Sequence, residues 1–273
     1  MMDNSELSRT LDTNKKQAEF YNTKKKNLPT RIWSSIREKT LHGIRKDLNI
    51  QQDFHDLHKI WFGELKGKKV LDLGCYAGNH HSRYLAENSK QYLGLDLSKV
   101  GIDILNKNLA HIPSGVGVVQ DFLSESFTEK DFDLIYAYGV LHHFENIDLL
   151  ISKLNEKLAD KGQIISYDPL QTSTPIWLIR KLYRPFQSDA AWEWPFSRKT
   201  LLKFDKHFDI LEKRGVLGHA KWFFILNLLP IPQEKKLKIG KSLHKKDWEN
   251  SNTSMSHLFT CMQLTMHMQK RGS

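Results

Sequence analysis

The segment from Val70 to His80 constrains the fold of this 273-residue chain more than any other part of it. An apolar run that ends Leu71-Asp72-Leu73 enters Gly74-Cys75-Tyr76-Ala77-Gly78 and then a helical segment. Glycine lacks a Cβ and tolerates positive φ, so such a turn brings backbone N–H groups close to a ligand. The segment predicts a strand, a nucleotide-binding loop and a helix N-terminus, and leaves the identity of the nucleotide open.

Residues 68–170 alternate short β-rich runs with helical segments, which is typical of a parallel sheet covered on both faces. We expect helices at His80 to Glu87, Lys99 to Asn108 and Ile147 to Leu158. The expected strands are Lys69 to Leu73, Gln91 to Leu95, Gly115 to Gln120, Phe132 to Tyr136 and Gln163 to Tyr167. The fold class is therefore α/β, with a doubly wound, Rossmann-like sheet.

The two ends of the chain differ from this middle zone. Residues 1–60 show helical periodicity without a convincing strand, so we interpret them as a helical cap on a core formed by residues 61–170. Residues 171–273 are expected to add lid insertions and complete the sheet within one enlarged domain. This last zone holds a lid-like segment, a helix and two strands, expected at Thr172 to Phe196, Ser197 to Lys206, Phe208 to Val216 and Cys261 to Gln269.

Composition excludes several classes of protein. Only Cys75 and Cys261 occur, so a disulfide framework or a four-cysteine zinc site is excluded, and we expect no metal. The polar N-terminus does not resemble a signal peptide. The longest nearly apolar run, Trp222 to Pro232, is shorter than the roughly 20 residues of a membrane-spanning helix. A cytoplasmic location is the expectation.

The net charge of +10 is unevenly distributed. Residues 69–170 hold 9 Lys or Arg against 14 Asp or Glu, whereas residues 171–273 hold 18 against 8. Basic clusters such as Lys24-Lys25-Lys26 and Lys235-Lys236-Leu237-Lys238 are able to attract nucleic acid or an anionic membrane. The simpler interpretation, which we favour, is that they form solvated helix faces.

Suitable ligand-binding groups follow four successive strands, where α/β sheets bind ligands. Asp96 comes 22 positions after Gly74, where a carboxylate accepts hydrogen bonds from ribose hydroxyls. Asp121 is suited to accept from an adenine amino group while Phe122 packs on the base, and Tyr138 follows the fourth strand. Two alternatives stay open: Asp96 caps the next helix, or Phe122 belongs to the core.

These motifs, in this order, resemble those of class I S-adenosylmethionine-dependent methyltransferases. The resemblance rests on Val70 to Gly78, Gly94 to Ser98, Val119 to Phe122, Asp131 to Ile135, Leu141 to Phe144 and Lys161 to Ile165. It implies a seven-stranded sheet with an antiparallel last strand and S-adenosylmethionine as the cofactor. The implied cofactor-binding residues are Asp72, Gly74, Cys75, Tyr76, Gly78, Asp96, Leu97, Asp121, Phe122 and Tyr138.

Tyr76 is where the sequence departs from this family. It occupies the position of the middle glycine, both in the family and in the G-x-G-x-x-G pattern of NAD-binding loops. A bulky residue there disfavours close contact with a pyrophosphate but leaves room for a methionine moiety. Tyr76 thus argues against NAD and places the geometry of the loop in question.

The acceptor is less clearly indicated. His142 and His143 follow the fourth strand and are candidates for removing a proton from a hydroxyl acceptor. The aromatic, basic segment from Ile176 to Phe186 favours a small-molecule or lipid-linked acceptor, with oxygen preferred and peripheral membrane contact as an option. Packing of a lid or a homodimer interface is the alternative for this segment. We expect no DNA partner. An RNA methyltransferase or a non-catalytic binding module is the alternative function.

Overall fold

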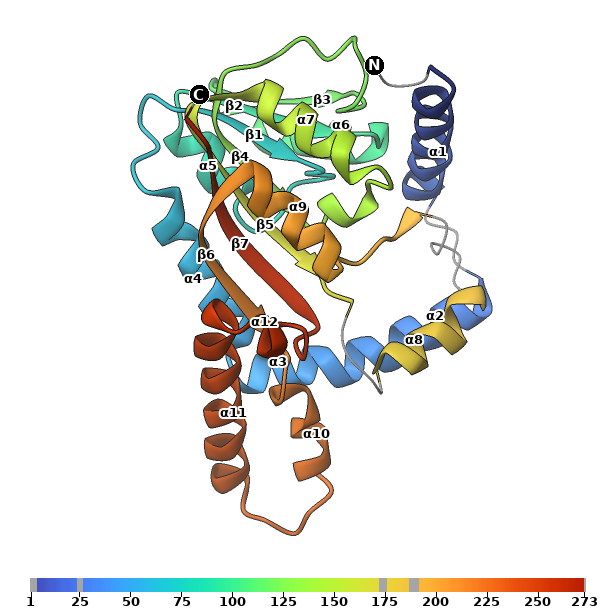
Figure 1. Ribbon diagram of the computed structural model, residues 1–273, viewed down its shortest axis with the longest axis vertical. Helices are drawn as coiled ribbons and strands as arrows, with labels where there is room; N and C mark the ends of the chain where they lie inside the picture. Colours follow the sequence, from blue (N-terminus) through green and yellow to red (C-terminus); the bar gives the residue numbers. More distant parts are fainter. Residues whose placement is uncertain (1–3, 24–26, 172–175, 187–191, 273) are drawn as a thin grey trace.

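The computed structural model describes residues 4–23, 27–171, 176–186 and 192–272 (Figure 1). One sheet of seven strands runs in the order β3-β2-β1-β4-β5-β7-β6. Pairs among β1 to β5 are parallel, and β7 is antiparallel to both β5 and β6, as predicted. The strands are β1 Lys69–Leu73, β2 Gln91–Asp96, β3 Gly115–Val119, β4 Phe132–Tyr138, β5 Leu158–Pro169, β6 Phe208–Val216 and β7 Gln263–Lys270.

The order of the strands reverses between β1 and β4, which are direct neighbours. In an open α/β sheet such a reversal leaves a crevice at the carboxyl ends of the strands. Hydrophobic residues of the strands pack into separate clusters on the two faces, with Tyr92 and Tyr136 fully buried in one of them. The sheet is therefore a buried platform whose carboxyl edge carries the loops.

All but the first of the helices after the strands begin at a residue whose side chain caps the helix. The side chain of Ser98 accepts the N–H of Gly101, and that of Asn146 accepts the N–H of Leu149. These helices are α5 Ser82–Asn88, α6 Lys99–Leu109, α7 Ile147–Lys157 and α9 Arg198–His207. The amino-terminal ones are α1 Asn4–Thr23, α2 Leu28–Arg37, η1 Glu38–His42, α3 Gly43–Asp47 and α4 Ile50–Phe62.

The remaining helical elements lie after β4, after β5 and between β6 and β7. They are η2 Leu141–His143, α8 Ile176–Tyr183, η3 Arg184–Phe186, η5 Ala220–Trp222, α10 Phe223–Leu226, α11 Gln233–Thr253 and α12 Met255–Leu258. Parts of the predicted lid segment, residues 172–175 and 187–191, lie outside the described residues. Residues 176–186 of this segment are described and form the helices α8 and η3.

Several predicted boundaries were wrong, each for a local reason. The helix after β1 begins at Ser82 and not at His80, because the side chain of Asn79 holds the N–H of His81 in a turn. β5 begins five residues early, at Leu158, since Leu158 pairs with Phe132 across a bulge. β7 begins at Gln263, because the N–H of Cys261 bonds to Leu258 in the turn that ends α12.

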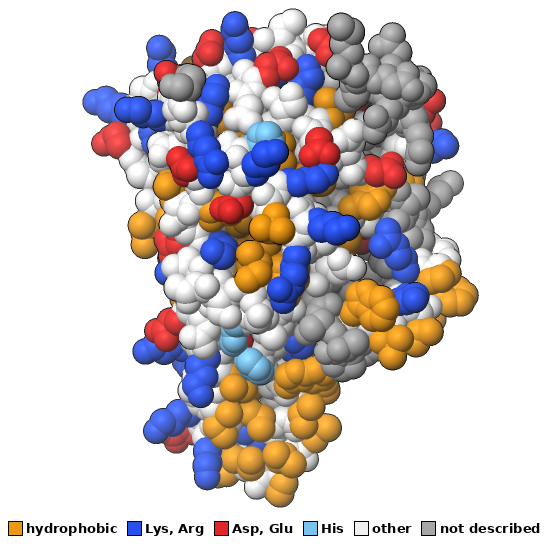
Figure 2. All heavy atoms as spheres, in the orientation of Figure 1, with side chains coloured by type: hydrophobic (Ala, Val, Ile, Leu, Met, Phe, Trp, Pro, Cys, Tyr) orange, Lys and Arg blue, Asp and Glu red, His pale blue; other side chains and the backbone are white. Residues whose placement is uncertain are grey.

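α10 and α11 extend away from the sheet at one end of the molecule (Figure 1). Figure 2 shows hydrophobic side chains gathered at this end, and the exposed ones on and after α10 include Phe224, Ile225, Leu228 and Leu229. Among the described residues, no helix combines the length and apolar character needed to cross a bilayer.

Candidate active site

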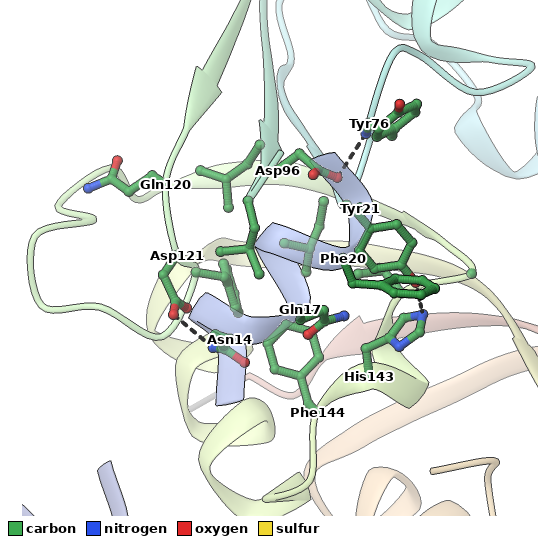
Figure 3. A pocket seen from close by; sticks show the side chains of 17 residues that line it. Asn14, Gln17, Phe20, Tyr21, Tyr76, Asp96, Gln120, Asp121, His143 and Phe144 are labelled. Carbon is green, nitrogen blue, oxygen red and sulfur yellow. Dashed lines mark hydrogen bonds between the residues drawn. The ribbon is translucent and has the colours of Figure 1, made fainter. Parts of the chain in front are cut away.

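A cavity of about 370 Å³ lies at the carboxyl ends of β1 to β4 (Figure 3). α1 crosses over it and contributes Asn14, Gln17, Phe20 and Tyr21 to its wall. The strand ends and following loops supply Leu73, Gly74, Tyr76, Leu95, Asp96, Leu97, Gln120, Asp121, Phe122, Gly139, Val140, His143 and Phe144. The structure therefore brings seven predicted site residues together: Gly74, Tyr76, Asp96, Leu97, Asp121, Phe122 and His143.

The glycine loop is shaped by three residues with positive φ, Gly74, Tyr76 and Gly78. Gly74 has a φ of 69°, and a Cβ added to it would lie 2.3 Å from a methyl carbon of Val140. Tyr76 also has a left-handed backbone, with a φ of 47°, a conformation that glycine adopts more cheaply. Tyr76 thus takes the backbone shape expected of the missing glycine while placing a ring at the cavity.

Asp96 holds this loop from the end of β2. Its two carboxylate oxygens accept the N–H groups of Tyr76, at 2.9 Å, and of Ser98, at 2.7 Å. Burial raises the pKa of Asp96, although these backbone hydrogen bonds act in the opposite direction. The carboxylate lines the cavity and keeps lone pairs for further donors. Asp96 therefore orders the loop and keeps acceptor capacity on the cavity side, and its binding to ribose stays a prediction.

Asp121 lies at the end of β3 under the amino-terminal helix. One carboxylate oxygen accepts the N–H of Leu123 at 2.9 Å, and the other accepts the side-chain amide of Asn14 at 2.7 Å (Figure 3). Phe122 borders the cavity but is only 2% exposed and packs in the core near Phe144. Phe122 is thus a core residue with one side on the cavity, and its packing on the base stays a prediction.

Four other predicted cofactor residues lie outside the cavity wall: Asp72, Cys75, Gly78 and Tyr138. Asp72 is fully buried and accepts hydrogen bonds from Asn79, Ser82 and Tyr92. Burial raises its pKa to about 6, against the effect of these hydrogen bonds. Asp72 therefore stabilises the loop from its buried side, and its carboxylate oxygens accept hydrogen bonds from other side chains of the protein.

The two predicted histidines have different surroundings. His142 is 7% exposed, lies outside the cavity wall, and has its Nδ1 2.9 Å from a carboxylate oxygen of the buried Asp168. His143 lines the cavity, with its Nδ1 2.6 Å from the carbonyl oxygen of Trp192 and its Nε2 3.2 Å from the hydroxyl of Tyr21 (Figure 3). Only His143 of the pair presents a ring nitrogen on the cavity side.

The hydrogen bonds of His143 fix its tautomer. A carbonyl oxygen only accepts, so Nδ1 carries the proton and Nε2 accepts from the Tyr21 hydroxyl. Burial, and then the neighbouring His142, lower the pKa of His143 to about 3. His143 is therefore neutral at pH 7, and the Tyr21 hydroxyl occupies the lone pair of its Nε2 at the cavity.

Sequence reasoning missed most of the α1 contribution to the cavity. Asn14 and Gln17 are 7% and 6% exposed, and they recur with Phe20 and Tyr21 at the three- and four-residue spacings of a helix face. The helical periodicity of residues 1–60 predicted helices that cover a core, without assigning Asn14, Gln17 or Phe20 to a cavity. Two buried amides on one helix face were the available signal for a polar ligand beneath it.

Comparison with known proteins identifies the family. Residues 45–214 match the family described as methyltransferase domain. An uncharacterized protein of Haemophilus influenzae is 34% identical over 107 positions, covering 37% of this chain and 42% of that protein. A tRNA U34 carboxymethyltransferase of Actinobacillus pleuropneumoniae is 27% identical over 135 positions, covering 46% and 40%. The chain spans about two fifths of the length of these relatives.

Solved structures share the fold at low sequence identity. The N-methyltransferase NodS from Bradyrhizobium japonicum, in complex with S-adenosyl-L-homocysteine, is 13% identical, with a TM-score of 0.51 over 81% of this chain and 87% of that one. Geranyl diphosphate C-methyltransferase from Streptomyces coelicolor is 11% identical, with a TM-score of 0.52 over 80% and 78%. The chain belongs to the methyltransferase domain family, in agreement with the S-adenosylmethionine-dependent class that its motifs resemble.

Proposed function

We propose that the enzyme methylates an oxygen atom of a small, largely apolar or lipid-like acceptor. The observation that carries this proposal is the Tyr21 hydroxyl lying 3.2 Å from Nε2 of His143 inside the cavity. A hydroxyl acceptor loses a proton during methyl transfer, and Nε2 of neutral His143 is a basic atom at the cavity, although burial lowers its pKa to about 3 and makes it a weak base. Nitrogen or stabilised carbon acceptors have less need of such a pair.

When bound, the cofactor supplies an activated methyl group on its sulfonium sulfur. The acceptor oxygen forms the new bond to this methyl carbon as the sulfur–carbon bond breaks. His143 receives the hydroxyl proton at Nε2, either directly or through the Tyr21 hydroxyl. The Trp192 carbonyl keeps Nδ1 protonated and the ring oriented throughout.

The walls of the cavity favour an apolar acceptor. Phe20, Phe144 and Val140 line it beside the His143 nitrogen, and α1 covers it. Excluding water and holding the acceptor in line with the methyl group are the main contributions that methyl transfer requires of the protein. These side chains suit an apolar body that carries one hydroxyl group.

Substitution of the proton-accepting pair tests this proposal. In assays with labelled cofactor and the lipid and small-molecule fractions of a cell extract, His143→Gln should lower turnover by about 100-fold or more, and Tyr21→Phe by less. Cofactor binding, measured by calorimetry, should change little in either variant. His111→Gln, at an exposed position, is the matched control. Full turnover by His143→Gln would overturn the proposed proton transfer.

The exposed apolar end of the molecule supports access to a lipid-like acceptor. Leu228 is 79% exposed, and the neighbouring helix α11 presents Lys235, Lys238 and Lys241 to solvent. Apolar side chains bordered by lysines suit the surface of an anionic bilayer. Co-sedimentation with phosphatidylserine vesicles should fall several-fold in Leu228→Glu. The equally charged change Leu202→Glu, on exposed α9, should have no effect, and equal binding by both variants contradicts membrane contact.

An RNA acceptor is the second candidate. It is favoured by the tRNA U34 carboxymethyltransferases among the relatives and by the basic ends of the chain. RNA binding that uses several lysines weakens steeply as salt rises. Labelling of tRNA in the same extract, with binding that falls at least about tenfold between 50 and 200 mM salt, would establish this function in place of the first.

A further inference from the structure

A second cluster of ligating groups lies far along the chain from the cavity residues. His219 precedes η5, Asp247 lies on α11 and His257 lies on α12. One metal-ligating atom of each residue lies within 4.8 Å of those of the other two. None of these residues lines the cofactor cavity, so the methyl-transfer chemistry leaves the cluster unexplained.

The distances in this cluster match those between ligands of one metal ion. Oδ1 of Asp247 lies 3.3 Å from Nδ1 of His219 and 3.2 Å from Nε2 of His257. Ligands held at about 2.0–2.2 Å from zinc lie about 3.0–3.5 Å from one another. The contact of His257 with Asp247 is a hydrogen bond, whereas the His219 contact is similarly short but lacks hydrogen-bond alignment. Two nitrogens and one carboxylate oxygen thus converge as co-ligands do.

The carboxylate of Asp247 lacks a permanent counter-charge. Its side chain is fully buried, and its oxygens accept the backbone N–H groups of His219 and Ala220. Among the described residues, its charge partners within 4.0 Å are these two histidines. A buried carboxylate is costly without a nearby positive charge, and a divalent cation removes this cost.

The surrounding chain makes room for this carboxylate and leaves one side open. A Cβ on Gly218 would lie 2.4 Å from Oδ1 of Asp247, so only glycine fits at that position. The side chain of His219 is 54% exposed, whereas that of His257 is 14% exposed. The open side provides a path for an ion and space for a water ligand.

We propose that His219, Asp247 and His257 form a divalent metal site of the zinc class. Imidazole and carboxylate ligands with one open position suit zinc. The site joins the base of the α10–α11 pair to α12, directly before β7 (Figure 1). Its role is structural: it fastens the projecting helices to the sheet, independently of methyl transfer.

Zinc titration of the chelator-stripped full chain tests this site. A competing chromophoric chelator should report one tight zinc ion per chain. His219→Ala and His257→Ala should each weaken zinc binding by at least about tenfold, because even residues that only support a ligand contribute that much. Binding should also weaken as the pH falls, because protons compete with zinc for the ligand atoms.

The matched control comes from another histidine cluster, formed by His55, His80 and His81. His80→Ala, at an exposed position, should leave zinc affinity unchanged. Zinc should raise the melting temperature of the wild-type chain and of His80→Ala, but not that of His219→Ala. Equal melting temperatures without metal show that His219→Ala folds. Zinc binding that survives His219→Ala, or is lost in His80→Ala, overturns the proposal.

Discussion

The ring of Tyr76 packs directly against the backbone of Gly101. A Cβ added to Gly101 would lie 2.6 Å from Cδ2 of Tyr76 and 2.9 Å from its carbonyl carbon. Gly101 lies in the first turn of α6 and donates its N–H to the Ser98 cap. In the family, a glycine in the loop leaves room at this position. Here the loop carries Tyr76, and the absence of a side chain at Gly101 in the facing helix leaves room for the tyrosine ring.

Gly101→Ala should therefore weaken binding of S-adenosylmethionine by at least about tenfold. Alanine normally stabilises a helix interior by about 0.5–1 kcal/mol relative to glycine, so a loss of stability would itself indicate the clash with Tyr76. Calorimetry and thermal unfolding measure the two effects. Gly43→Ala is the matched control, because nothing lies within 4 Å of a Cβ there. Unchanged cofactor affinity in Gly101→Ala would show that the loop adapts without cost.

Asp96→Ala should raise the Kd for S-adenosylmethionine by about 30- to 100-fold. Loss of a charged acceptor costs about 1.5–3 kcal/mol per hydrogen bond, and the variant also releases the loop at Tyr76. Asp96→Asn, which keeps one acceptor oxygen, should lose less. The surface change Asp103→Ala on α6, which breaks only the exposed pair with Lys99, should bind normally. If all three variants bind the cofactor with equal affinity, Asp96 does not contribute to the cofactor site.

Asn14→Ala should tighten cofactor binding by up to about tenfold. Its amide donates to one carboxylate oxygen of Asp121, so it competes with an adenine amino group for the lone pairs of that oxygen. The increase should appear in calorimetric titrations with S-adenosyl-L-homocysteine, with the exposed neighbour Lys15→Ala unchanged. Weaker binding by Asn14→Ala would mean that the amide holds the base itself.

The stability of the protein should fall steeply as the pH drops from 6.5 toward 4. Five histidines have a lowered pKa in the folded state, so the unfolded chain binds more protons in this range and gains stability relative to the folded one. Burial is the main cause for each: His55 and His267 to about 4, His81 and His143 to about 3, and His58 well below 6.5.

Asp72 has the opposite effect on the pH dependence of stability. Its pKa is raised to about 6, so the folded state holds an extra proton between about pH 4 and 6. The balance is an uptake of about four protons on unfolding near pH 5. Urea titrations at pH 5, 6 and 7 measure this slope, and His143→Gln should reduce it by about one proton. A free energy of unfolding that is constant over this range would contradict the neutral state of these histidines.

Much of the fold followed from local signals. The β-rich runs at residues 69–73 and 91–95 were correct because each lies between turn residues and is buried in the sheet. Boundaries were less accurate where tertiary contacts set them, as at Leu158, whose strand pairing with Phe132 depends on β4. The antiparallel last strand came from the family resemblance and was confirmed by its pairing.

The candidate site, like the fold, was predictable from the sequence only in part. Residues at strand ends, such as Asp96 and Asp121, were predictable, since the geometry of a parallel sheet brings its carboxyl ends together. The different surroundings of His142 and His143 were not, because Asp168, Trp192 and Tyr21 come from distant parts of the chain.

By itself the sequence determined the order of strands and helices, the glycine loop and the carboxylates that follow it, since these depend on spacing along the chain. The tertiary structure alone decided which side chains reach the cavity. It buried Asp72 beneath the loop, placed α1 over Asp121, and brought His219, Asp247 and His257 together. Contacts between residues this far apart are set by packing, which no local pattern encodes.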